Sequence, residues 1–196
     1  MDSGGIKIDA AGLTSWQLKA LLAVEDPSFF THKGVDLKTP GAGITTITQG
    51  LVKILYFKKF KPGIAKFKQT IIARFVLDRM VCKKEQLTLF INLIYLGRSG
   101  DKPVYGFYNA AAVYYGKEVA ALTEDEYLSI AAMIIAPANF SLTGRPDANR
   151  ERTRRLKALV SGKYRPKGLM DLYYGPLDDT AAKGLAPASY FPGIYE

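Results

Sequence analysis

The chain has few residues that could cross-link it or bind zinc. Its 196 residues contain one cysteine, Cys82, and one histidine, His32. A single cysteine excludes an intrachain disulfide, and one cysteine with one histidine excludes a zinc site built from a Cys/His cluster. A carboxylate site for a hard cation is the metal site that this composition still allows.

Long apolar runs are also missing. A helix that spans a membrane needs about 20 nearly uninterrupted apolar residues, and the best runs here, at 128–138 and 90–96, are far shorter. The first five residues lack the basic and apolar regions of a signal peptide. We therefore expect a protein that reaches a membrane only peripherally, with a membrane anchor absent from this chain.

Positive charge is abundant and concentrated in one segment. The chain has a formal net charge of +9. Residues 53–84 hold ten Lys or Arg residues against Asp78, so this segment alone has a net charge of +9. Such a segment favours a polyanionic partner: nucleic acid, anionic lipid headgroups or a pyrophosphate group. No helix-turn-helix, RNP or zinc-finger pattern is present, so we expect no nucleic-acid partner.

Apolar residues recur mostly with helical spacing. A capping box at Thr14 and Gln17 predicts a helix that Pro27 ends, with Glu25 in its last turn. Further helices are expected from Thr46 and over 64–81, 84–95 (closed by Gly97), 110–115, 123–136 and 150–160. The Gly- and Thr-rich stretch 31–50 is expected to be a flexible loop. Alternating strand patterns are nearly absent, so the sequence predicts a mainly α fold.

Specific motifs lie on this framework. The run from Glu25 to Asp36 has the pattern E-D-x-x-F-x-x-H-x-G-x-D, and Gly43 to Gly50 reads G-I-T-T-I-T-Q-G. Downstream come Asn92-Leu-Ile-Tyr-Leu-Gly97 and a Tyr-Gly pair at 105–106 before Ala-Ala-Ala-Val-Tyr-Tyr-Gly-Lys at 110–117. These motifs resemble, in order over about residues 14–160, those of the peptidoglycan glycosyltransferases, the polymerising domain of bifunctional penicillin-binding proteins.

The resemblance implies a lysozyme-like helical domain over residues 1–162, with a basic, partly flexible, membrane-facing subdomain at about 38–68. The remaining residues, 163–196, are rich in Pro and Tyr and are expected to pack on the domain as an irregular tail. The implied reaction is polymerisation of lipid II onto lipid-linked glycan at the outer, periplasmic face of the cytoplasmic membrane. Lipid II, the lipid-linked glycan and the anionic membrane surface are the implied partners, and no protein partner is indicated.

In this family Glu25 matches the general base that accepts the proton of the acceptor 4-hydroxyl. Its position at a helix C-terminus beside Asp26 should raise its pKa. The leaving pyrophosphate requires cations and hydrogen-bond donors. The residues that we expect to contact substrate are Asp26, Phe29, His32, Thr46, Thr48, Gln49, Lys53, Lys66, Gln69 and Arg74. Asp26 and His32 could equally serve to organise the loop.

One family motif is incomplete. The R-K-x-x-E helix of the family carries a second glutamate that is associated with donor pyrophosphate, through a divalent cation (Mg or Mn) or a basic residue. Counting back from Asn92 without a gap places Thr70 there, and one inserted residue places Gln69 there instead. Three functions stay open: a divergent polymerase, a lysozyme-like lytic enzyme with Glu25 as general acid, and a non-catalytic module that binds lipid II or glycan.

Overall fold

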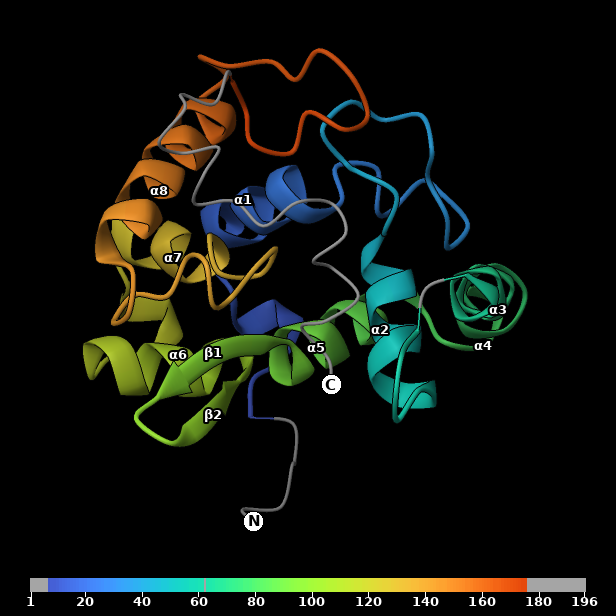
Figure 1. Ribbon diagram of the computed structural model, residues 1–196, viewed down its shortest axis with the longest axis horizontal. Helices are drawn as coiled ribbons and strands as arrows, with labels where there is room; N and C mark the ends of the chain where they lie inside the picture. Colours follow the sequence, from blue (N-terminus) through green and yellow to red (C-terminus); the bar gives the residue numbers. More distant parts are fainter. Residues whose placement is uncertain (1–6, 62, 176–196) are drawn as a thin grey trace.

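The computed structural model describes residues 7–61 and 63–175 and confirms the mainly α fold (Figure 1). Its helices and strands are α1 (Ser15–Glu25), α2 (Ile47–Tyr56), α3 (Ile64–Ile72), α4 (Asp78–Met80), α5 (Lys83–Leu93), β1 (Tyr95–Ser99), β2 (Lys102–Tyr105), α6 (Gly106–Tyr115), α7 (Glu124–Ala131) and α8 (Pro146–Val160). Helix α1 lies centrally and contacts α7 and α8, whereas α2, α3 and α4 form a lobe to one side.

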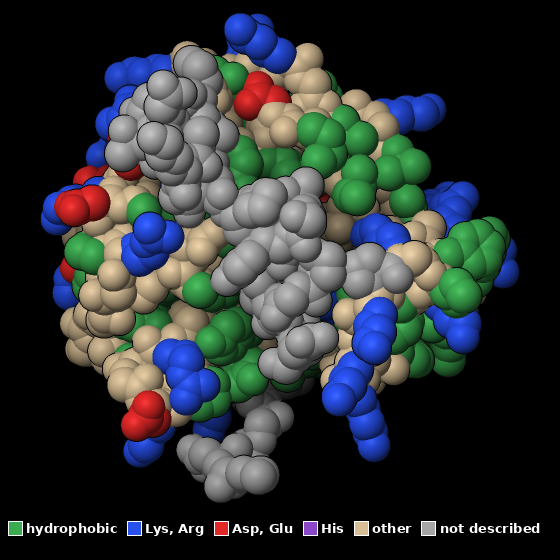
Figure 2. Space-filling view, in the orientation of Figure 1, with side chains coloured by type: hydrophobic (Ala, Val, Ile, Leu, Met, Phe, Trp, Pro, Cys, Tyr) green, Lys and Arg blue, Asp and Glu red, His purple; other side chains and the backbone are tan. Residues whose placement is uncertain are grey.

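That lobe presents an apolar and basic surface. Figure 2 shows hydrophobic and Lys or Arg side chains gathered on the side of α3 and α4, with the acidic side chains visible elsewhere. We call this the lobe surface; its large exposed apolar residues are Ile54, Leu55, Tyr56, Ile64, Phe67, Ile71, Phe75 and Met80. Among the described residues, none of the helices is both long enough and apolar enough to cross a membrane.

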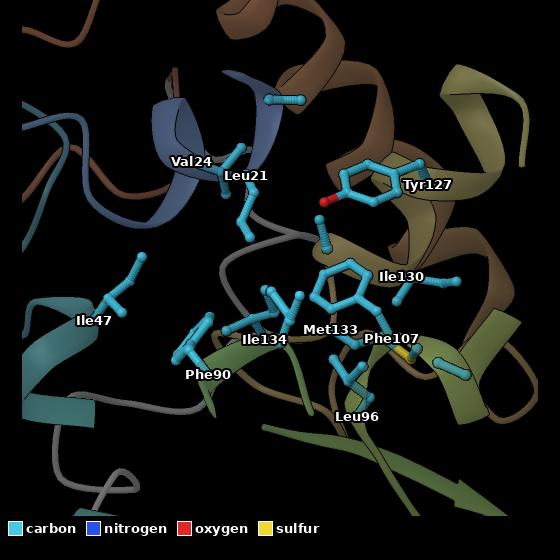
Figure 3. Close-up of a cluster of buried hydrophobic side chains, with 14 of the residues drawn as sticks. Leu21, Val24, Ile47, Phe90, Leu96, Phe107, Tyr127, Ile130, Met133 and Ile134 are labelled. Atoms are coloured by element: carbon cyan, nitrogen blue, oxygen red, sulfur yellow. The ribbon is translucent and has the colours of Figure 1, made fainter. Parts of the chain in front are cut away.

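The core lies between α1, α5, α6 and α7 (Figure 3). Leu21 from α1, Phe107 from α6 and Tyr127 from α7 are completely or almost completely buried there, and the Phe107 and Tyr127 rings stack with their centroids 5.2 Å apart. Burying such side chains is the main source of stability in a domain of this size. The core fixes α1, and with it the position of Glu25 at the end of that helix.

Helix starts follow local capping. The predicted box at Thr14 and Gln17 is present, and Thr46 with Gln49 and Thr123 with Glu126 form two more. In each box the threonine oxygen accepts the N3 backbone N–H and the N3 side chain accepts the N-cap N–H. Helix α8 starts at Pro146, earlier than the predicted 150, because proline suits the first helical position.

Two of the predicted helix ends are wrong. Helix α5 ends at Leu93 rather than at Tyr95, and Gly97 lies in β1 of the antiparallel hairpin of β1 and β2 instead of closing the helix. The sequence pattern did not reveal these short strands. Helix α7 ends at Ala131 rather than at 136 because side chains of α8 bind the carbonyl groups that would continue it: Asn149 donates to Ser129 and Arg152 to Ala132.

The predicted helix over 64–81 contains a π-helical turn, Ala73–Leu77, between α3 and α4. A π turn holds one more residue than an α turn. Gly34 packs on this turn: its φ is +80°, and a Cβ there would lie 2.5 Å from the Ala73 carbonyl oxygen. Glycine is therefore required where the 31–46 loop crosses the π turn.

Candidate active site

Glu25 is the last residue of α1 and the most perturbed carboxyl group near the motifs. Its side chain keeps a partial opening to solvent, but the surrounding protein still desolvates the carboxyl group. Burial raises its pKa from 4.5 to about 7; the Arg152 guanidinium opposes the rise and the Asp26 carboxylate adds to it. The predicted rise is therefore present, but burial contributes more to it than the neighbouring Asp26 does.

Asp26 is fully buried and acts as a connector. Both of its carboxylate oxygens lie 2.9 Å from His32 Nε2, and Oδ2 also accepts the backbone N–H of Ile47 at 3.0 Å. Ile47 is the first residue of α2, so Asp26 joins the end of α1 to the start of α2. The structure thus gives Asp26 and His32 the loop-organising contacts that the sequence left as one of two alternatives.

The Thr-rich motif at the start of α2 is bonded mainly to protein. Thr46 donates from Oγ1 to the Gly34 carbonyl at 2.8 Å, and Gln49 donates from Nε2 to Thr70 Oγ1 at 3.0 Å. Thr48 is fully buried and donates to Gln86 Oε1 of α5 at 2.7 Å. The Thr46 and Thr48 hydroxyl groups, which are expected to contact substrate, make buried contacts that hold α2 in place.

Lys53 of α2 and Lys66 of α3 approach each other across the lobe. Burial lowers both lysine pKa values from 10.5 to about 8, and the Lys66 charge contributes to the decrease at Lys53. Lys66 donates from Nζ to Thr45 Oγ1 at 2.8 Å and to the Ile44 carbonyl at 3.1 Å, and Lys53 Nζ lies 4.8 Å from the centroid of the Phe60 ring. Both cations are therefore partly desolvated, and Lys66 binds the end of the glycine-rich loop (residues 31–46).

Gln69 lies one turn from Lys66 and is almost completely buried. Its Nε2 donates to the Gln49 carbonyl at 2.6 Å, whereas its Oε1 has no hydrogen-bond partner in the described part of the chain. Thr70 instead donates to the Lys66 carbonyl of its own helix at 2.9 Å. Among residues 7–61 and 63–175, no group of three or more His, Cys, Asp or Glu side chains gathers to hold a metal ion.

Comparison with known proteins identifies the family. A model of the transglycosylase family matches residues 6–160. Penicillin-binding protein 1F of Bacillus subtilis is 35% identical over 147 residues, which are 68% of this chain and 20% of that protein. Penicillin-binding protein 1B of Buchnera aphidicola is 30% identical over 161 residues, 75% of this chain and 21% of that protein.

The chain belongs to the peptidoglycan transglycosylase family. It spans about a fifth of the length of these curated relatives. Penicillin-binding protein 1B of Escherichia coli is 29% identical over 140 residues, 65% of this chain and 16% of that protein. Family membership makes this a glycosyltransferase domain of peptidoglycan synthesis.

The π turn lies between Asn92 and the two positions, Gln69 and Thr70, at which the resemblance would place a second glutamate. If no residue is inserted between α3 and Asn92, the position of the glutamate corresponds to Thr70. If one residue is inserted, it corresponds to Gln69. The turn Ala73–Leu77 holds one more residue than an α turn would. The side chains of both residues contact α2: Gln69 donates to the Gln49 carbonyl, and Thr70 Oγ1 accepts from Gln49 Nε2.

Phe29 and Arg74, which are also expected to contact substrate, lie in the core and on the π turn of the transglycosylase. Phe29 is buried in the core, with Lys83 Nζ 4.5 Å from its ring centroid. Arg74 is on the π turn and donates to the Lys33 carbonyl at 3.0 Å. It lines a cavity of about 320 Å³ with Lys33, Phe75, Asp78 and Arg79. The structure therefore groups Arg74 with the 32–38 loop and Phe29 with the core.

Two residues near Glu25, Arg152 and Tyr174, had no role predicted from the sequence. Arg152 of α8 is buried and acts electrostatically on Glu25, and Tyr174 donates its hydroxyl to the Val24 carbonyl at 3.0 Å. Tyr174 lies beyond the family match, so the tyrosine content of the tail was the only sequence feature that could have drawn attention to it.

Gln69→Glu tests this arrangement. An ionised carboxylate cannot donate to the Gln49 carbonyl, so the free energy of unfolding should fall by about 1–3 kcal/mol at neutral pH. The pKa of the introduced buried carboxyl group should be raised, so the loss should shrink as the pH is lowered toward about 5. Chemical unfolding at both pH values measures this. An equal loss at both would contradict the assigned hydrogen bond.

Proposed function

We propose that this transglycosylase polymerises lipid II, with Glu25 as the general base that accepts the proton of the acceptor 4-hydroxyl. The observation that carries the proposal is the Glu25 pKa of about 7 at the fixed end of α1. A base with a pKa near the working pH combines a useful ionised fraction with enough basicity to accept a proton.

The two lysines supply the complementary charge. As the 4-hydroxyl oxygen attacks the anomeric carbon, the bond to the lipid pyrophosphate breaks and negative charge grows on the leaving oxygen. We assign Lys53 and Lys66 to stabilise that charge because they are close together and partly desolvated. The Asp26–Ile47 and Gln69–Gln49 hydrogen bonds connect their lobe to Glu25.

The residues around Gln69 do not fit a divalent cation held by the protein. Mg²⁺ and Mn²⁺ prefer carboxylate ligands, but Gln49, Gln69 and Thr70 offer amide and hydroxyl groups. Lys66 lies on the same side of this helix, three residues before Gln69. The proposed mechanism therefore assigns the pyrophosphate charge to lysine and routes no step through a metal.

The lobe surface matches a lipid-linked substrate. Exposed apolar residues of α2, α3 and α4 lie among Lys58, Lys59, Lys61 and Lys68 (Figure 2). Each Lys or Arg near an anionic bilayer contributes roughly 1 kcal/mol of binding free energy. We propose that this surface rests on the outer face of the cytoplasmic membrane, where lipid II and the growing glycan would be reached from the bilayer.

Glu25→Gln should abolish glycan synthesis from labelled lipid II while stabilising the fold. Ionising a carboxyl group whose folded pKa is raised costs stability, and this cost grows as pH rises from 4.5 to 7. Above pH 7 the variant should therefore gain up to about 3 kcal/mol. Polymer gels and chemical unfolding measure the two effects. Full activity in the variant would exclude Glu25 as the base.

The pH dependence distinguishes polymerisation from lysis. A general base works when deprotonated, so kcat/KM for lipid II should rise with pH through about 7. It should fall above about 8, where Lys53 and Lys66 lose their charge. A lytic enzyme with Glu25 as general acid would instead release more soluble fragments from purified sacculi as pH falls below 7. A module that only binds would retain both substrates and convert neither.

Lys66→Gln should lower kcat by roughly 100-fold, the typical effect of losing one donor to a developing oxyanion. It should also weaken the alkaline decrease in rate, because one of the two groups with a pKa of about 8 is removed. Lys19→Gln is the control because Lys19 is an exposed lysine on α1, outside the lobe surface. Equal rates for the two variants would refute the assignment of Lys66.

A further inference from the structure

Residues 163–175, which we call the strap, follow α8 and lie outside the family match. In Figure 1 the strap runs from the end of α8 to the side of the 31–46 loop. It contains no helix or strand, but Arg155 of α8 donates to the Tyr173 and Gly175 carbonyls at 3.2 and 3.3 Å. Asp171 accepts the Tyr164 hydroxyl and the Lys167 backbone N–H. The strap therefore has a defined conformation.

The strap binds the glycine-rich loop through its backbone. The Gly41 N–H donates to the Gly168 carbonyl and the Gly43 N–H to the Leu169 carbonyl, both at 2.9 Å. Both glycines have positive φ, +77° and +67°. A Cβ at Gly41 would lie 2.7 Å from Pro166 Cγ, and one at Gly43 would lie 3.0 Å from Leu172 Cδ2. A side chain at position 41 would therefore clash with the strap, and one at position 43 would require Leu172 to move.

The strap also binds the end of the helix that carries Glu25. Tyr174 is buried and donates its hydroxyl to the Val24 carbonyl at 3.0 Å, directly before Glu25. It adopts φ +54°, which is unusual for a residue with a side chain. Arg152 of α8 donates to the Leu172 carbonyl of the strap at 3.1 Å, and its guanidinium carbon lies 5.7 Å from the Tyr174 ring centroid.

We propose that the strap positions the active site. Tyr174 and the backbone of residues 168–169 hold Glu25 and the glycine-rich loop in fixed positions relative to each other. The inference rests on the proposed function for its kinetic consequence, but not for its structural one. Three contacts of independent origin support it: the backbone pair to the loop, the Tyr174 bond to α1, and the bond from Arg152 of α8 to the Leu172 carbonyl.

The charged and titratable groups that act on Glu25 come from three sides. Asp26 follows it in the chain and raises its pKa, Arg152 of α8 lowers it, and Tyr174 of the strap lies close enough for Glu25 to raise the tyrosine pKa. Burial is the largest cause of the Glu25 shift. Displacing the strap should admit water to this region, so the Glu25 pKa should fall from about 7 toward 4.5.

The first test is Gly41→Ala, compared with Gly100→Ala in the whole chain. Both glycines have positive φ, but a Cβ at Gly100 meets nothing within 4 Å, so only Gly41→Ala displaces the strap. Hydrogen exchange at the Gly43 amide should accelerate by about tenfold or more in Gly41→Ala alone. Titration of the Glu25 carboxyl carbon by NMR should show a lower pKa in the same variant.

The second test is Tyr174→Phe, compared with Tyr108→Phe on the exposed face of α6. Removing the Tyr174 hydroxyl should lower kcat for lipid II by about tenfold with KM nearly unchanged, because a positioning contact is lost and no substrate contact is. The lower pKa in the pH dependence of this rate should also shift. Tyr108→Phe should change neither quantity.

These readouts separate the two proposals. If the wild-type chain makes no polymer, the proposed function fails, and exchange at Gly43 with the Glu25 titration still decides the role of the strap. If Gly41→Ala and Tyr174→Phe both leave Gly43 exchange and the Glu25 pKa unchanged, the strap is only a surface covering and the inference is overturned. Should Gly41→Ala fail to fold, Tyr174→Phe alone decides, by the titration of Glu25.

Discussion

The buried Asp26 carboxylate is the contact on which the geometry of the site depends. It accepts hydrogen bonds from His32 and from the first backbone N–H of α2, so it fixes the end of α1 against the start of α2. A buried charge persists only when its partners are in place, and loss of one partner is strongly destabilising. Because Glu25 immediately precedes Asp26, the same contact determines where the candidate base lies relative to the Thr-rich motif.

A second set of contacts extends this arrangement into the lobe. Thr46 bonds to the Gly34 carbonyl, Gln49 bonds to Thr70, and Gln69 bonds to the Gln49 carbonyl. Each joins the loop or α2 to its neighbour through neutral groups. The lobe can therefore carry Lys53 and Lys66 at its edge without placing another charge in its interior. An amide at position 69 suits this arrangement because it can donate to a carbonyl at neutral pH, which a carboxylate cannot.

The parts of the fold that could be predicted are those encoded by neighbouring residues. The capping box at Thr14 and Gln17 and the break at Pro27 determined where α1 starts and ends, and therefore that Glu25 ends a helix. The β1–β2 hairpin was missed because Gly97 and Pro103 interrupt its alternation. The end of α7 depends on Asn149 and Arg152, which approach it only in the folded chain. Helical periodicity contains no signal for the π turn.

The candidate site shows the same division between local and distant information. The motif identified Glu25, and Asp26 beside it predicted the sign of the pKa shift, but the larger cause is burial by parts of the chain that sequence cannot place. Burial acts in opposite directions on acids and bases, raising the pKa of Glu25 and lowering those of Lys53 and Lys66. One physical cause thus brings a carboxyl group and two ammonium groups toward the same pH range. This convergence requires the loop, α2 and α8 to keep water partly away from Glu25 and the lysines, which is why hydrogen bonds that touch no reacting atom belong to the chemistry of the site.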